Sequence, residues 1–298
     1  MTINAEDNTA VLRYAAFTLD PAGGNPAGIV LDATGLADEA MQRIAAEVGY
    51  SETAFLRPLP EAEPGMGPGA RAFAARYFSP LAEVPFCGHA TIAGAVALAE
   101  HDGPGPLSFA TKAGQIPVET GHDPDGHLVA TLTSVATRTA AAAPEDVAEA
   151  LAALGWAADE LDPALPPHIA YAGANHLVLA AATRERLADL DYDFERLRTL
   201  MLDRDWTTVQ LVWRESAHVF HVRNPFPVGG VVEDPATGAA AAALGGYLRE
   251  LGLIAPPVEL RLYQGADMGR PGVLTVHVPG DAPGVRVSGT AVPIGADA

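Results

Sequence analysis

The sequence predicts an α+β protein made of two similar halves, each with a strongly curved sheet wrapped around one central helix. Three observations support this prediction. Segments recur in the same order at an offset of about 150 residues. Strand-like and helix-like stretches follow one another in the same order within each half. The last helix of each half lacks a polar face, so it has to be buried on all sides.

The internal repeat is faint in any one pair of segments but consistent over six of them. The pairs are residues 24–26 with 174–176, 41–44 with 194–202, 51–56 with 207–212, 70–80 with 216–227, 88–91 with 238–241, and 111–114 with 262–265. The period is too long for a solenoid, whose repeats span roughly 20–50 residues. The repeat therefore favours two duplicated domains over the alternative of two unrelated α+β halves.

Each half is predicted to contain strand, strand, helix, strand, strand, helix and a final hairpin. Residues 51–56 and 70–80 have the composition and alternation of strands, and residues 41–44 lie on a helix. Residues 194–202 form the corresponding helix of the second half. These elements lead up to the central helix in each half.

The two central helices are expected at residues 90–100 and 239–250. Both are apolar on nearly every face until the last turn, and both contain glycine, at Gly94 and at Gly245 and Gly246. Small side chains allow neighbouring backbone to approach a helix closely. The pattern favours a sheet that wraps around the helix, with two ordinary open sheets as the alternative.

The domain boundary is expected near residues 137–143, a plausible linker that ends before Pro144. We expect an N-terminal domain of residues 1–137, completed by residues 286–298. The C-terminal domain is then residues 138–285. The length of 298 residues is sufficient for two ordinary domains with substantial cores.

Composition and charge exclude several classes of function. The chain has 18 basic and 37 acidic residues, a net charge of −19, which disfavours binding to nucleic acid or to anionic membranes. Cys87 is the only cysteine, so neither an internal disulfide nor a cysteine-based zinc cluster can form. The longest apolar stretches are shorter than a membrane span, and the first nine residues lack a signal-peptide core. We expect a soluble cytoplasmic protein.

Both central helices begin with glycine, at Gly88 and Gly238, followed by small residues. The first amides of a helix have no partner within the helix and carry the positive end of its dipole. Two such ends facing one cleft would bind a carboxylate without a basic side chain. The alternative is that the two glycines only mark where helices start.

Three ionisable residues are candidates for chemistry: His89 and Asp234 lie next to these helix starts in the sequence, and Glu52 lies at a predicted strand start. Glu52 starts a strand between apolar residues, where burial would raise its pKa and suit it to proton transfer near neutrality. Each residue also has a structural alternative. Glu52 can be a surface residue, His89 can be a structural helix cap, and Asp234 can be an N-cap.

The sequence motifs resemble those of the PhzF phenazine-biosynthesis family. The motifs are Gly24-Asn25-Pro26-Ala27, Ser51-Glu52-Thr53-Ala54-Phe55, Pro85-Phe86-Cys87-Gly88-His89-Ala90-Thr91, Glu233-Asp234-Pro235-Ala236-Thr237-Gly238, and Gln264-Gly265 with Gly269-Arg270-Pro271. They occur in the family's order over nearly the whole chain, from about Tyr14 to Ile294. The resemblance implies a diaminopimelate epimerase-like α+β fold with two pseudosymmetric domains, each a curved, mostly antiparallel sheet or barrel around a central helix.

The resemblance also implies a biosynthetic isomerase, acting without a cofactor or metal on a small-molecule carboxylate similar to dihydro-hydroxyanthranilate. It assigns proton transfer to Glu52, with His89 and Asp234 as further catalytic residues. The substrate-binding positions are Gly88, Ala90, Gly238 and Ala239. Family members are expected to be homodimers. A non-catalytic small-molecule-binding protein and a related epimerase or lyase are the alternatives.

Four residues bear on the function that the resemblance implies. The family usually has serine where this chain has Ala239. One neutral hydrogen bond from a hydroxyl, worth about 1 kcal/mol, is therefore missing. The identity of the substrate is left open by this difference. Cys87 is expected to be a small buried hydrophobe, because a two-thiol racemase needs a second cysteine. His218 and His221 lie three apart on a predicted strand and face opposite sides, which makes a poor metal site.

Overall fold

The computed structural model of the chain describes residues 2–4, 9–60 and 69–295. The chain divides into two compact units. The first contains residues 1–133 and 288–298, and the second contains residues 134–287. Within the described residues, no helix is long and apolar enough to cross a membrane.

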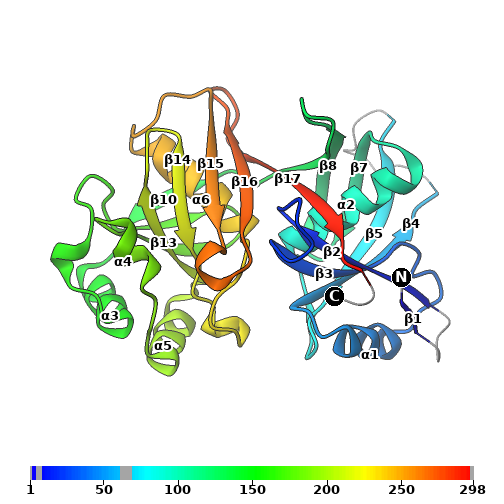
Figure 1. The fold of residues 1–298 in the computed structure, drawn as a ribbon, viewed down its shortest axis with the longest axis horizontal. Coiled ribbons are helices and arrows are strands. Elements are labelled where there is room, and N and C mark those ends of the chain that lie inside the picture. The colour runs from blue at the N-terminus through cyan, green and yellow to red at the C-terminus, as the bar shows by residue number, and fades with distance from the viewer. Residues whose placement is uncertain (1, 5–8, 61–68, 296–298) are drawn as a thin grey trace. The chain divides into compact units, whose positions relative to one another are not determined.

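The first unit consists of strands and two helices (Figure 1). Its strands are β1 (Thr2–Asn4), β2 (Thr9–Ala16), β3 (Asn25–Val30), β4 (Glu52–Pro58), β5 (Arg71–Phe78), β6 (Glu83–Val84), β7 (Pro106–Thr111), β8 (Gly114–His122), β9 (Leu128–Thr133) and most of β17 (Arg286–Pro293). Its helices are α1 (Asp38–Val48) and α2 (Gly88–Asp102). From β2 to β8 these elements follow the predicted order apart from the two-residue β6, whereas β1, β9 and β17 are strands beyond that order.

Eight strands of the first unit form a closed ring. Strand pairs join β2 to β3, β3 to β4, β4 to β5, β5 to β7, β7 to β8 and β8 to β9. Strand β17 pairs with both β9 and β2 and closes the ring. Two of the pairings, β3 with β4 and β5 with β7, are parallel. The predicted wrapped sheet is therefore a barrel, and the alternative of an open sheet is wrong for this unit.

Helix α2 lies inside this ring and contacts β2, β3, β4, β8 and β9 (Figure 1). Residues 89–99 of the helix are all buried. This burial follows from their composition, because a helix with no polar face is stable only where apolar side chains surround it. Helix α1 instead packs on the outside of the sheet, with Met41 and Ile44 against Phe55 of β4. The start of α2 is thus held by strands on several sides.

The second unit has seven strands and four helices (Figure 1). The strands are β10 (Arg138–Ala141), β11 (His168–Tyr171), β12 (Asn175–Ala180), β13 (Thr208–Arg214), β14 (Val219–Arg223), β15 (Val258–Gln264) and β16 (Gly272–Val278). The helices are α3 (Pro144–Leu154), α4 (Arg184–Ala188), α5 (Phe194–Arg204) and α6 (Gly238–Glu250). Short 3-10 turns cover residues 158–160, 227–229 and 266–268.

The pairing pattern of the second unit matches that of the first. Strands β11 to β16 pair in sequence as antiparallel, parallel, antiparallel, parallel and antiparallel. The first unit has the same succession from β2 to β8, with β6 left aside. Helix α6 contacts β10, β11, β12 and β16, so it occupies the place in its sheet that α2 has in the first unit.

Side chains alternate across β12 and β13 because successive strand residues point to opposite faces. Leu177, Leu179 and Leu211 belong to a core with α3 and α5. His176 and Thr208 lie on the other face, and the pairing places them directly opposite each other. One face of these strands is thus mainly apolar, whereas the face shared with α6 carries buried polar groups.

The predicted linker at residues 137–143 needs correction. Residues 138–141 form β10, which pairs with β11 in antiparallel register from Arg138 opposite Tyr171. Its side chains are mostly exposed, so the segment has no hydrophobic alternation that would identify a strand. Helix α3, which begins at Pro144 and ends before Gly155, was also not predicted. The predicted boundaries at 137 and 286 differ by a few residues from the limits of the compact units.

Candidate active site

Glu52 and His89 lie together in the first unit. Glu52 is the first residue of β4, where it pairs with Ala27 of β3, and its side chain is 16% exposed. His89 is the second residue of α2 and is 6% exposed. The Nε2 atom of His89 is 3.5 Å from Oε2 of Glu52. The fold therefore brings together two predicted catalytic residues that are 37 positions apart in the chain.

The other contacts of His89 indicate which ring nitrogen carries the proton. Nδ2 of Asn25 lies 3.1 Å from Nδ1 of His89, and Oγ of Ser51 lies 3.4 Å from Nε2. With the Asn25 amide donating to Nδ1, a neutral ring carries its hydrogen on Nε2 and directs it toward Glu52. Nε2 is therefore the ring nitrogen of His89 that faces the carboxylate of Glu52.

The strand and turn before β3 explain why Asn25 reaches His89. Gly24 has φ +53° and packs against the backbone of Ala16 so closely that a Cβ atom would lie 2.1 Å from the Ala16 oxygen. Only glycine fits this turn, which starts β3 with the fully buried Asn25. The motif Gly24-Asn25-Pro26-Ala27 was identified from sequence, but the contact between Asn25 and His89 was not predicted. In the sequence, the available signal for this contact was an asparagine that directly follows a glycine.

Cys87 precedes α2 and is buried, as predicted, yet its surroundings are polar. Its Sγ atom lies 3.3 Å from Nδ1 and 3.8 Å from Nε2 of His89. Its backbone oxygen accepts a hydrogen bond from the Thr91 hydroxyl at 2.6 Å, and that hydroxyl also contacts Tyr77. The description of Cys87 as a small hydrophobe is therefore incomplete, since the thiol contacts a candidate catalytic residue.

The start of α2 has the features of an anion-binding helix end. No acidic residue lies in its first turn, and the side chain of Cys87 does not cap it. The partial positive charge of the helix dipole is thus not neutralised by the helix's own side chains. Gly88 is half-buried, whereas Ala90 is fully buried. A role for either residue in substrate binding stays a prediction.

Asp234 lies in the second unit, in a turn that leads into α6. Its Oδ2 atom accepts a hydrogen bond of 2.5 Å from the Thr237 hydroxyl. Gln264 holds both ends of this turn. Its Oε1 accepts from the Thr237 amide at 3.0 Å, and its Nε2 donates to the Asp234 carbonyl oxygen at 2.7 Å. Gln264 thus positions the turn that carries Asp234. Its motif was identified from sequence, but no role was predicted for it.

Glu233 and Asp234 are neighbours with different environments. Glu233 forms a buried, two-pronged ion pair with Arg223, with distances of 3.0 and 2.6 Å. Arg223 also donates to the Ala188 oxygen at 2.6 Å. Because Glu233 is held in this pair, Asp234 is the acid available at the start of α6. Gly238 is buried, and Ala239 is half-buried on the first turn of that helix.

Two groups of side chains among the described residues have donor atoms close enough to share a metal ion. One is Glu52, Cys87 and His89, and the other is Asp123, Asp125 and His127 on an exposed turn. His218 and His221 are in neither group, and Nε2 of His221 instead contacts Glu215 at 2.6 Å. The two histidines therefore have the poor arrangement for a metal that the strand pattern predicts.

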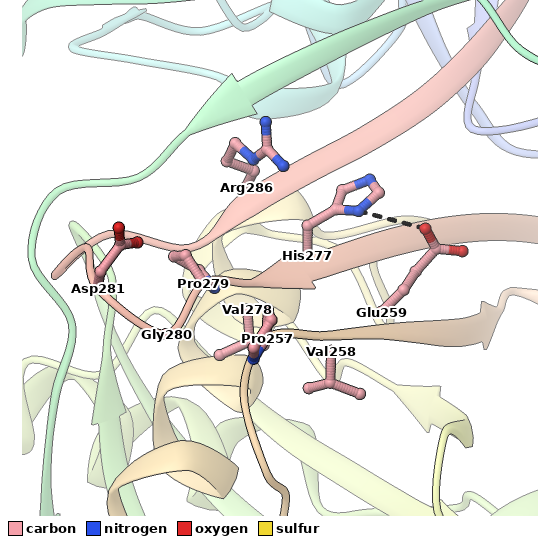
Figure 2. Close-up of a pocket in the computed structure, with 9 residues that line it drawn as sticks. All are labelled: Pro257, Val258, Glu259, His277, Val278, Pro279, Gly280, Asp281 and Arg286. Carbon is pink, nitrogen blue, oxygen red and sulfur yellow. Dashed lines mark ion pairs between the residues drawn. The ribbon is translucent and has the colours of Figure 1, made fainter.

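A surface hollow in the second unit lies at one end of β15 and β16 (Figure 2). Figure 2 shows the ion pair in which Nδ1 of His277 lies 3.3 Å from Glu259. Burial lowers the pKa of His277, Glu259 opposes that shift, and Arg286 adds to it. None of the predicted site residues lines the hollow.

The fold first defines a class of protein. A proline racemase from Agrobacterium radiobacter superposes with a TM-score of 0.62 at 12% identity, covering 96% of this chain and 91% of that one. A likeness at this identity shows the fold alone. Together with the barrel around α2, it identifies the racemase and epimerase type of α+β fold, as predicted.

The chain belongs to the phenazine biosynthesis-like (PhzC-PhzF) family, whose sequence model matches residues 14–296. An uncharacterized isomerase of Bacillus subtilis is 30% identical, with 95% of each chain covered. The trans-2,3-dihydro-3-hydroxyanthranilate isomerase of Pseudomonas chlororaphis is 32% identical, over 94% of this chain and 95% of that one. A PhzF-family protein of Bacillus anthracis superposes with a TM-score of 0.83 at 28% identity, over 96% of each chain. The protein is an isomerase of this family.

Proposed function

We propose that this isomerase moves a proton between carbon atoms of a small carboxylic acid, with Glu52 as the general acid and base. The contact between Glu52 and His89, both largely buried, carries this proposal. A carboxylate can take a proton from carbon and return it elsewhere when it is positioned beside the reacting atoms. The sequence similarity to a trans-2,3-dihydro-3-hydroxyanthranilate isomerase favours a substrate of that chemical type.

In the proposed mechanism His89 orients Glu52 and the substrate. Its Nε2–H donates toward the carboxylate, while Asn25 fixes the ring through Nδ1. Ser51 offers a hydroxyl next to the same nitrogen. A hydrogen bond from Nε2–H of His89 would stabilise negative charge near Glu52.

The substrate carboxylate is proposed to bind at helix starts, through Gly88 and Ala90 of α2 and Gly238 and Ala239 of α6. The first amides of these helices and the helix dipoles supply positive potential in an acidic chain. Asp234, fixed by Thr237 and Gln264, is proposed as a further catalytic residue. A methyl group at Ala239 removes one hydroxyl donor, which favours a substrate different from that of serine-containing relatives.

The architecture is proposed to be two pseudosymmetric domains that arose from one duplicated unit. The common succession of strand pairings supports this, as does one buried glycine-containing helix in each unit. We further propose a cytoplasmic homodimer, as expected for members of the family. Light scattering during gel filtration of the full chain tests the dimer, and a monomer mass would refute it.

Replacing Glu52 by Gln is the direct test of the proton-transfer role. The probe is trans-2,3-dihydro-3-hydroxyanthranilate in deuterated water, with deuterium incorporation followed by mass spectrometry. We expect incorporation by the wild type and a loss of ~10²–10⁴-fold in Glu52→Gln, because the amide cannot accept the proton. Glu119→Gln, an exposed residue of β8, is the matched control and should keep the wild-type rate.

The outcomes separate the proposed function from its alternatives. An active Glu52→Gln variant rejects the mechanism. A wild-type chain that binds the acid without exchanging hydrogen would be a binding protein that retains the site. Product with inverted configuration at one carbon would indicate a related epimerase.

A further inference from the structure

We propose that Glu52, Cys87 and His89 form a zinc site, and that zinc bound there reversibly inhibits the isomerase. The three side chains come from the start of β4, the residue before α2 and the first turn of α2. Their ligand atoms all lie within 4.8 Å of one another. The set combines a thiolate, an imidazole and a carboxylate, all of which are ordinary zinc ligands.

The distances between the ligand atoms fit one tetrahedral ion. Zinc bonds of 2.0–2.3 Å place neighbouring ligand atoms about 3.3–3.8 Å apart. Nε2 of His89 is 3.5 Å from the Glu52 oxygen and 3.8 Å from the Cys87 sulfur. Small side-chain rotations are therefore enough to direct the three groups at one ion. The fourth position remains for solvent or a small carboxylate.

The charges also balance at this site. A Cys87 thiolate and the Glu52 carboxylate together neutralise a divalent cation, while His89 binds as a neutral ligand. On binding, the thiol proton leaves to solvent and the ring proton moves from Nε2 to Nδ1.

Asn25 completes the site as a second-layer partner. Histidine ligands of zinc donate their other ring N–H to a nearby acceptor, which fixes the ring. The Asn25 amide is 3.1 Å from Nδ1 and presents either its nitrogen or, after rotation, its oxygen. The same residue therefore holds His89 in both the metal-free and the metal-bound states.

Inhibition follows if Glu52 carries the proton, so this part rests on the proposed function. A carboxylate bound to zinc is a much weaker base, because the ion neutralises its charge. The exposed cluster of Asp123, Asp125 and His127 provides the matched control, because it lacks a thiol.

Cobalt(II), added to the purified full-length chain, is the probe for binding because a thiolate ligand gives it a strong near-ultraviolet charge-transfer absorption. We expect one cobalt ion per chain with this absorption, and its loss when one equivalent of zinc is added. Cys87→Ser should abolish the absorption and weaken zinc binding by ~10-fold or more. The double variant Asp123→Asn, His127→Gln should keep both the cobalt absorption and the affinity for zinc.

Protection of Cys87 from alkylation by zinc, measured on the wild type, gives the same information should Cys87→Ser fail to fold. The proposal is overturned if wild-type chain shows no thiolate absorption, if zinc leaves alkylation unchanged, or if the absorption persists in a folded Cys87→Ser chain.

The activity readout separates failure of the zinc site from failure of the proposed function. With the dihydro-hydroxyanthranilate probe, zinc should suppress deuterium exchange by the wild type, and a chelator should restore it. Cobalt absorption without inhibition by zinc would leave the site in place and reject Glu52 as the proton carrier. Normal exchange without cobalt absorption would reject the site and leave the proposed function intact.

Discussion

At the scale of single residues, the second unit contains a chain of buried polar groups that ends at the Asp234 turn. Nδ1 of His176 lies 2.8 Å from the Thr208 hydroxyl, which donates to Oδ1 of Asn224 at 2.9 Å. The backbone oxygen of Asn224 accepts from the Asp234 amide at 3.0 Å. Because Thr208 gives its proton to Asn224, it accepts from Nδ1–H of His176. His176 is fully buried and its Nε2 has no hydrogen-bond partner among the described residues, so burial favours the neutral ring.

This arrangement predicts a loss of stability in mild acid. Burial lowers the pKa of His176 to about 3, from 6.5 for an exposed histidine. The unfolded chain binds a proton below pH 6.5 that the folded chain excludes, so stability falls as pH drops from 6.5 toward 3. The slope from one such group is at most about 1.4 kcal/mol per pH unit. Urea unfolding between pH 7.5 and 5 measures it.

His176→Gln provides the comparison for that measurement. Burial also lowers the pKa values of His168 and His277, which act in the same direction. The variant should therefore show a shallower pH slope than the wild type, without becoming flat. Equal slopes in the two chains would contradict the assignment to His176.

Ion pairs at the residue scale differ sharply in burial, which gives a second prediction. Glu233 and Arg223 have side chains 4% and 8% exposed, whereas Glu149 and Arg196 are each 43% exposed. Removing one charge from a buried pair leaves the other uncompensated, at a cost of about 3–5 kcal/mol. An exposed pair contributes about 0–1 kcal/mol.

Glu233→Gln should therefore destabilise the chain by about 3 kcal/mol, and Glu149→Gln by less than about 1 kcal/mol. Both changes keep side-chain size, so the difference reports the charge. Chemical denaturation at pH 7 measures both variants. A loss in Glu233→Gln no greater than that in the control would show that the buried pair does not stabilise the turn before Asp234.

At the scale of elements, the two central helices differ in how much space surrounds their glycines. A Cβ atom on Gly246 of α6 would lie 2.4 Å from the side chain of Thr137. A Cβ atom on Gly94 of α2 would lie 3.4 Å from Leu56 and farther from other neighbours, which is ordinary contact. The close packing inferred from sequence is thus strict at Gly246 and relaxed at Gly94.

Alanine substitutions at these two positions should have opposite effects. Gly94→Ala should be neutral or stabilising by up to about 1 kcal/mol, because alanine favours a helix over glycine by that amount. Gly246→Ala should destabilise by about 1–3 kcal/mol through overpacking against Thr137. Thermal unfolding compares the pair, and a stable Gly246→Ala chain would contradict the packing argument.

At the scale of the whole molecule, the two compact units are built differently along the chain. The second unit is continuous, from residue 134 to 287, whereas the first needs residues 288–298 from the end of the sequence. Strand β17 pairs with β2 and β9, so it closes the barrel around α2. An isolated 1–133 segment lacks that closing strand.

Expression of the separate segments tests this difference. Residues 134–287 should unfold cooperatively by themselves, because all the pairings among β10 to β16 lie within them. Residues 1–133 should show no cooperative transition, and fusion of residues 288–298 through a flexible linker should restore one. Cooperative unfolding of residues 1–133 alone, followed by circular dichroism, would contradict a structural role for β17.

An element or a site residue could be predicted from the sequence when the pattern that identifies it lies within one short segment. The central helices and β4 were predictable because their apolar patterns lie within one segment. Strand β10 was not, since its exposed side chains carry no alternation. Glu52, His89 and Asp234 were selected by motif, and the structure brings the first two together. The contacts of Asn25, Ser51 and Gln264 were not predicted, because each of them joins residues that are far apart in the chain.

The sequence by itself determined the family, the succession of strands and helices, and the residue types available for proton transfer. Motif order and hydrophobic period are properties of neighbouring residues, so no coordinates were needed for them. Only the tertiary structure decided which ring nitrogen of His89 faces Glu52, and that Cys87 lies beside them. It also decided that β17 closes the first barrel. These features depend on contacts between distant segments, which form only when the sheets curve around their helices.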